Sequence, residues 1–132
     1  MCFNAAASFA ASAVLIPAGL HTLRIARAAD ARWLALAAFP LLFGVQQALE
    51  GVLWLALGDP LGDLVGVPPS TLAPALALGF LAFAYVLWPM LVPLAARSVE
   101  SRPRRRLMFG LLAVAGAASG LFIYLPLLLN PG

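Results

Sequence analysis

Four long apolar stretches, separated by short polar segments, dominate the pattern of the sequence. They cover about residues 5–23, 33–57, 71–96 and 107–129. Each can cross a hydrocarbon core of about 30 Å as a helix that rises about 1.5 Å per residue. Lipid offers no partner for unpaired backbone groups, and the stretches lack the alternating polarity of barrel strands. The pattern therefore predicts an all-α integral membrane protein, a four-helix transmembrane bundle that forms a single domain over residues 1–132.

The composition excludes a soluble globular domain. Hydrophobic residues make up 64% of the chain and charged residues 10%, whereas soluble domains are about 45–50% apolar and about 25% charged. The formal net charge of +3 does not point to nucleic acid, because the basic side chains are all arginines confined to segments between the apolar stretches. That distribution is typical of charges that set membrane topology.

The polar segments also predict an orientation. Residues 24–32 and 97–106 hold every arginine, whereas residues 58–70 hold Asp59 and Asp63 and no basic residue. Short loops rich in arginine stay in the cytoplasm. We therefore expect the first and third loops inside, and the acidic second loop and both termini outside.

Small residues are dense at two places in the apolar stretches. Residues 5–12 are mostly alanine and serine, and Gly116 and Gly120 form a small-xxx-small pair in the fourth stretch. Such residues let helix backbones approach closely in lipid. Packing within one chain accounts for them, and so does an interface with a partner protein or a second copy of the chain.

Glu50 is the only formally charged residue inside the apolar stretches. A carboxylate at membrane depth is costly, so it usually faces a partner group or a water-filled cavity. Gln46 and Gln47 precede it by one helical turn, and Gln47, Glu50 and Trp54 share a helix face. This cluster is expected either to fix helix register as a satisfied polar contact or to bind a cation, a proton or a polar ligand.

Other polar side chains are expected near the cluster because the topology brings them to the same depth. Cys2, Asn4 and Ser8 lie at the outer start of the first stretch, and Tyr124 lies in the outer half of the fourth. Cys2, Asn4 and Tyr124, together with Glu50 and its two glutamines, make up a hypothetical ligand-binding site in the outer half of the bundle.

His21, the single histidine, lies near the inner end of the first stretch. A lone intramembrane histidine can ligate haem or a chlorin metal through a neutral ring nitrogen, or it can cap polar groups at the interface. No zinc site is expected, because the candidate ligands, one His, one Cys and one Glu, are split between opposite sides of the membrane. A Ser-His-Asp set, a phosphate loop and a pair of intramembrane carboxylates are all missing, so we predict no catalytic residue.

Two segments carry a family resemblance. The opening MCFNAAASF and the segment FGVQQALEGVLW, at residues 43–54, resemble a bacterial family of uncharacterised membrane proteins. Its chains typically begin Met-Cys-Phe-Ser-Ala and carry Gln-Gln-x-x-Glu-Gly-x-x-Trp in the second span; Asn4 stands here in place of the usual Ser. The resemblance implies a multi-pass protein of the bacterial cytoplasmic (inner) membrane and implies no reaction.

Three functions are compatible with these features. The first is a non-enzymatic accessory or structural subunit that packs against membrane lipids and against other membrane proteins or further copies of itself, as short loops and small-residue faces suggest. The second is a transporter-like or ligand- or cation-binding protein that uses Glu50. The third is a pigment- or haem-binding subunit that uses His21. The sequence identifies no particular cofactor.

Overall fold

The computed structural model describes residues 4–66, 68–70 and 72–129, and the regular elements of this part are all helical. The elements in chain order are α1 (Ala5–Ala29), η1 (Ala31–Trp33), α2 (Leu34–Ala37), α3 (Phe39–Ala56), α4 (Pro60–Val65), α5 (Ala73–Ala82), η2 (Phe83–Leu87), α6 (Trp88–Val99) and α7 (Pro103–Leu129).

Four helical segments are long and apolar enough to cross a membrane, which confirms the predicted number of such helices. They run over Ala5–Ala29, Ala31–Ala56, Ala73–Val99 and Pro103–Leu129. At the arginine-rich end, each helix continues beyond the predicted apolar stretch, most clearly in α1. The hydropathy changes where a helix leaves the hydrocarbon, but arginine is itself a good helix former, so the helix does not stop there.

The acidic segment between the second and third spans contains a short helix, α4, which the apolar pattern does not predict. Its signals are local. Asp59 caps it by accepting a hydrogen bond from the Leu61 amide at 2.8 Å, and Pro60 occupies the first helical position. Gly66 ends it with a φ of 75°, a left-handed conformation that favours glycine.

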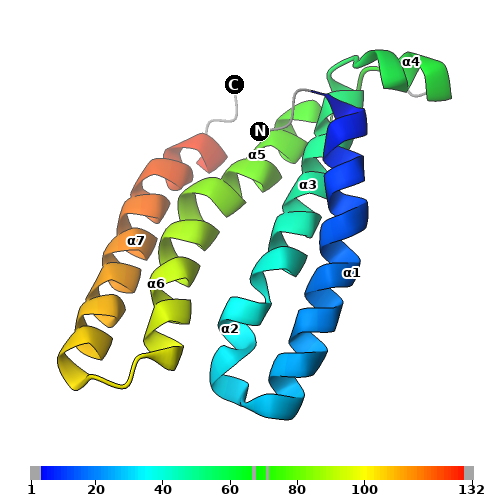
Figure 1. Ribbon diagram of the computed structural model, residues 1–132. Helices are drawn as coiled ribbons and strands as arrows, with labels where there is room; N and C mark the ends of the chain where they lie inside the picture. Colours follow the sequence, from blue (N-terminus) through cyan, green and yellow to red (C-terminus); the bar gives the residue numbers. More distant parts are fainter. Residues whose placement is uncertain (1–3, 67, 71, 130–132) are drawn as a thin grey trace.

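The spans form two antiparallel hairpins that lie side by side (Figure 1). One consists of α1 against α3, and the other of the continuous α5–η2–α6 segment against α7. The hairpins meet where α3 contacts α5 and where η1 and α2 contact α6. Figure 1 shows α1 and α7 at opposite edges of this row. The four spans thus form an open layer in which the two outermost helices do not close against each other.

The backbones of helices α1 and α3 approach each other closely. The buried positions of α1 all carry small side chains: Ala5, Ser8, Ser12, Gly19 and Ala26. Four of these recur every seven residues, the repeat of a left-handed helix pair. A Cβ placed on Gly19 would lie 2.5 Å from Leu41 Cα, and one on Gly44 would lie 2.9 Å from the Ile16 amide nitrogen. The small residues at the start of α1 are therefore used within the chain.

The glycine pair of α7 is also used within the chain. A Cβ on Gly116 would overlap the carbonyl of Pro89, and a Cβ on Gly120 would overlap the carbonyl of Tyr85. Pro89 and Pro93 have no N–H, so neither of these carbonyls has an i+4 donor in its own helix. The two carbonyls face the two glycines instead, an approach typical of Cα–H···O contacts between helices. Of the two explanations for this pair, packing within the chain is the one observed.

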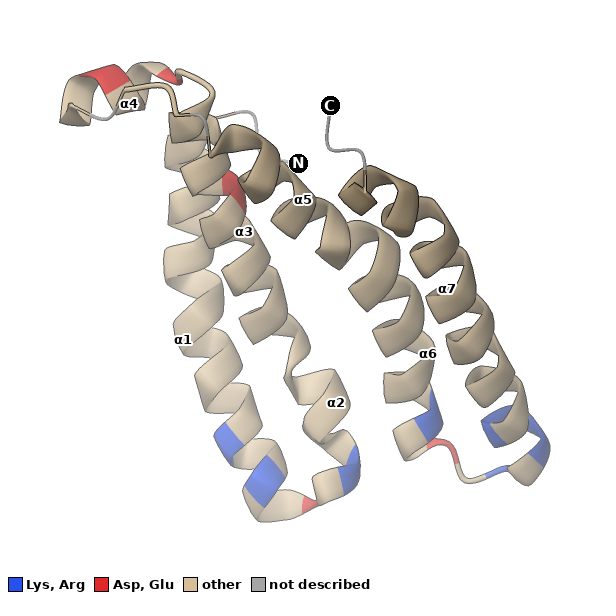
Figure 2. Cartoon of the chain, turned by 180° about the vertical axis from the view of Figure 1, so that it is seen from behind, with Lys and Arg blue, Asp and Glu red and all other residues tan. Residues whose placement is uncertain are grey.

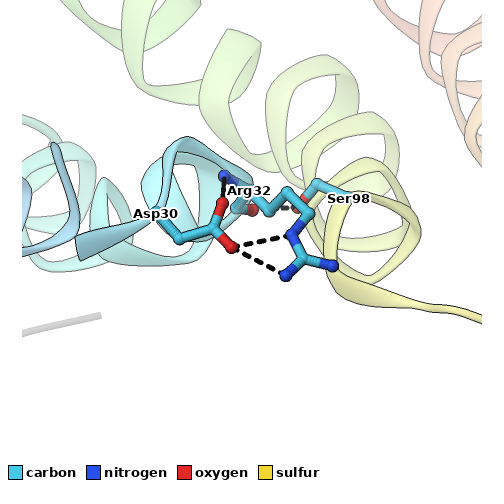
Figure 3. Close-up of polar contacts among 3 residues, drawn as sticks. All are labelled: Asp30, Arg32 and Ser98. Carbon is cyan, nitrogen blue, oxygen red and sulfur yellow. Dashed lines mark hydrogen bonds and ion pairs between the residues drawn. The ribbon is translucent and has the colours of Figure 1, made fainter.

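A polar bridge ties the two hairpins together at the arginine-rich end (Figure 3). The Ser98 hydroxyl lies 2.7 Å from the carbonyl oxygen of Arg32, 66 positions away in the sequence. Arg32 also pairs with Asp30, with 2.7 Å between Nη2 and Oδ2. The hydrogen bond from the Arg32 side chain is the main cause that lowers the pKa of Asp30 below its usual value. Asp30 is therefore held on Arg32 as a carboxylate.

Candidate functional site

Glu50 is buried inside the helical layer, with 1% of its surface exposed. It lies on α3 six residues before Ala56, so about 9 Å from the end of the helix at a rise of about 1.5 Å per residue. Gln47 Nε2 donates a hydrogen bond to Glu50 Oε2 at 2.8 Å. The i, i+3 spacing on one helix places the two groups within reach of each other, so this contact follows directly from the sequence.

Two further polar groups are buried near this level, and both lack a hydrogen-bond partner in the described part of the chain: the Ser8 hydroxyl and the Trp54 indole N–H. Ser8 is fully buried on α1. A Cβ on Gly51 would lie 2.7 Å from the ring of Phe9, so Ser8 and Glu50 lie at the same depth on neighbouring helices. Trp54 follows Glu50 by one helical turn.

Neither Ser8 nor Trp54 belongs to the predicted ligand-binding set, although Ser8 is expected at this depth and Trp54 on the helix face of Glu50. The signal for Trp54 was its position four residues after Glu50 on one helix face. The signal for Ser8 was weaker, because serine in a small-residue helix face is ordinary packing. Only the register between α1 and α3 buries Ser8 at the depth of Glu50.

Gln46 is buried but takes part in a different contact. Its Oε1 accepts a hydrogen bond from Trp88 Nε1 at 2.7 Å. Trp88, at the start of α6, stacks on Phe43 with 4.1 Å between ring centroids and meets Phe39 edge-on at 5.7 Å. Gln46 thus belongs to the junction between the two hairpins. Its amide oxygen accepts the hydrogen bond that the Trp88 indole N–H needs inside the layer.

Two other predicted site residues, Asn4 and Tyr124, make hydrogen bonds of their own. The Asn4 side chain caps α1 by accepting a hydrogen bond from the Ala7 amide at 2.8 Å. The Tyr124 hydroxyl donates to the carbonyl oxygen of Leu78 in α5 at 3.0 Å. Cys2 lies outside the described residues.

An open cavity of about 620 Å³ lies next to the buried site, at the end of the layer that carries α4. Its polar lining comes from Asn4, Trp54 and Asp59, and the rest is mainly apolar. Both carboxylate oxygens of Asp59 are engaged, one by the Leu61 amide and the other by the Ala5 amide at 3.2 Å. Trp54 thus lines this recess and also lies one helical turn from Glu50.

His21 lies on the exposed surface of α1 and faces away from the helical layer. Its ring is open to lipid or to another molecule, so haem or pigment ligation remains a prediction about an external group. Among the described residues, no group of three or more His, Cys, Asp and Glu side chains could hold a metal ion.

Comparison with known proteins leads to one family. A family model described as "Family of unknown function (DUF6629)" matches residues 1–127 of the chain. The prediction of an uncharacterised family is thereby confirmed. No curated protein and no solved structure matches the chain.

Proposed function

We propose that this chain, which belongs to the family of unknown function DUF6629, is a small non-enzymatic membrane protein that acts as an accessory or structural subunit. The observation that carries the proposal is the open layer of four spans. The buried hydrophobic residues of the described chain are all alanines: Ala5, Ala26, Ala56, Ala95 and Ala113. Many large apolar side chains are exposed, where lipid or a partner protein can cover them.

The edges of the layer support packing against other membrane proteins. Helix α7 contacts the rest of the chain along its glycine face, and its other faces are exposed, with Phe122 82% and Val114 68% exposed. At the other edge, Val14 of α1 is 70% exposed. Because the glycines are already used within the chain, a partner at either edge would pack against larger apolar side chains. Such contacts are driven by van der Waals packing.

The partner prediction can be tested with site-specific photo-crosslinkers in native membranes. A crosslinker at Phe122 is expected to give a discrete protein adduct that mass spectrometry can identify as a partner or a second copy. Leu64 of α4 is the matched control, because it is also 82% exposed but lies outside the row of spans. Crosslinking at Phe122 and at Val14 that yields only lipid adducts, with a monomeric chain after mild-detergent purification, would contradict the proposal.

We also propose that both termini face outward from the cytoplasmic membrane of a bacterium. The support is the charge distribution: Figure 2 places the blue arginine segments at one end of the layer, with α4 and its acidic residues at the other. Arginine-rich short loops stay in the cytoplasm. Alkaline phosphatase fused after Gly132 is therefore expected to be active, and green fluorescent protein fused there to be dark. The reverse pair of results would overturn the orientation.

A second candidate is a polar-ligand or cation-binding role at Glu50, as in a transporter-like protein. The observation in its favour is the pair of buried donors, Ser8 and Trp54, at the level of the carboxylate. A buried donor without an acceptor costs about 1–3 kcal/mol. An indole N–H can only donate, so a ligand that satisfies Trp54 must offer an acceptor, either directly or through a bound water. A hydrated cation or an uncharged polar molecule meets this requirement.

A further inference from the structure

A second cavity, of about 270 Å³, lies between α1 and α2 at the opposite end of the layer from Glu50. Its lining has two parts. Leu20, Leu23 and Leu34 form an apolar part, and Arg24 and Arg27 form a cationic part. The four residues from α1 follow the i, i+3, i+4, i+7 spacing, so they form one stripe along the helix. Leu34 begins α2 across from them. The cavity therefore joins a hydrocarbon surface to two guanidinium groups.

The two arginines of this cavity have no carboxylate partner among the described residues. The two carboxylates at this end of the layer are engaged elsewhere. Asp30 pairs with Arg32 at 2.7 Å, and Glu100 lies 3.8 Å from Arg105 and also accepts a hydrogen bond from the Arg102 amide. Neither acid neutralises Arg24 or Arg27, so the cavity keeps two unpaired positive charges.

The placement of the cavity along the span fits a membrane surface. From Leu20 to Arg27 the helix advances about 10 Å, at about 1.5 Å per residue. The leucines therefore lie on the hydrocarbon side, and the guanidinium groups reach toward the headgroups, where arginine side chains extend in membrane proteins. Figure 2 shows that the blue segments of both loops lie at this end, so the local field favours an anion.

We infer that this cavity binds one anionic phospholipid from the leaflet on the arginine side. The lipid phosphate lies between Arg24 and Arg27, and one acyl chain covers Leu20, Leu23 and Leu34. Guanidinium groups bind phosphate oxygens through paired N–H donors, which gives the site geometry as well as charge. A free phosphate ion would leave the apolar half of the cavity uncovered. The inference does not depend on the proposed accessory role.

The test measures lipid retention by the whole chain in nanodiscs. Native mass spectrometry is expected to show one retained phosphatidylglycerol, with phosphatidylcholine bound at least about tenfold more weakly, because each arginine near the membrane surface adds attraction for an anionic lipid. The variant Arg24→Ala/Arg27→Ala should lose about tenfold or more of the phosphatidylglycerol affinity. The matched control Arg102→Ala/Arg104→Ala removes the same charge from the other loop and should change it by about twofold or less.

A third variant separates charge from geometry and guards against a folding defect. Arg24→Lys/Arg27→Lys keeps both charges but loses the paired donors, so its affinity should fall between those of the parent chain and the alanine variant. Equal losses in the alanine variant and the loop control would show only general attraction to the membrane surface and would overturn the site. Equal retention of phosphatidylglycerol and phosphatidylcholine by the parent chain would also overturn it.

Discussion

Replacing Gly120 with alanine is expected to lower the free energy of unfolding by about 1–3 kcal/mol or more, the usual range for overpacking a tight contact. The added Cβ would overlap the carbonyl oxygen of Tyr85, which belongs to the backbone of η2 and cannot rotate away. Relief requires α7 to separate from η2 and α6. Unfolding in mixed micelles, followed by circular dichroism over a series of dodecyl sulfate concentrations, measures the change.

Gly79→Ala is the matched control for this prediction. Gly79 also lies within a helical span, but a Cβ there would first meet Leu49 Cδ2 at 3.1 Å, the far end of a flexible side chain. Alanine gains about 0.5–1 kcal/mol over glycine in a helix interior, and this gain is common to both variants. The control should therefore be neutral to slightly stabilised, and Gly116→Ala should behave like Gly120→Ala. Similar stabilities for the Gly120 and Gly79 variants would show that the contact between α7 and η2 is not tight.

Replacing Glu50 with leucine is the second change expected to have a large effect. The Gln47 amide would lose the acceptor that it now has at 2.8 Å. Removing one partner of a buried hydrogen bond typically costs about 1–3 kcal/mol. Glu50→Gln keeps the shape and an oxygen acceptor, so it should lose much less stability than Glu50→Leu in the same unfolding assay. A leucine variant as stable as the parent chain would mean that the buried hydrogen bond contributes little.

The same variants separate a structural contact from a binding site. If the carboxylate holds a cation, the parent chain should gain stability as sodium, potassium, magnesium or calcium chloride is added, and Glu50→Gln should lose that gain. Glu100→Gln is the control, because it removes a carboxylate at the arginine-rich end of the layer. If the chloride series stabilises the parent and Glu50→Gln equally, Glu50 has a structural role only.

Local features of the site could be predicted from the sequence because helix geometry alone fixes them. Gln47 lies three residues before Glu50 on one helix, so their hydrogen bond needs no information from other spans. Gln46 is equally close in sequence, but its partner is Trp88, 42 positions away. The packing of α6 against the second span determines which glutamine pairs with the carboxylate, and nothing within residues 43–54 specifies that packing.

The sequence by itself determined the number of spans and their helical state, because lipid leaves the backbone no other way to satisfy its polar groups. It also determined that the arginines gather at one end of the layer. The tertiary structure decided which helix faces meet. Gly120 packs against the carbonyl of Tyr85, Ser8 lies at the depth of Glu50, and the Tyr124 hydroxyl donates a hydrogen bond to the Leu78 carbonyl. The physical reason is that a membrane helix is apolar on every side. It lacks the amphipathic stripe that orients a helix in a soluble protein, so close backbone packing selects the faces instead.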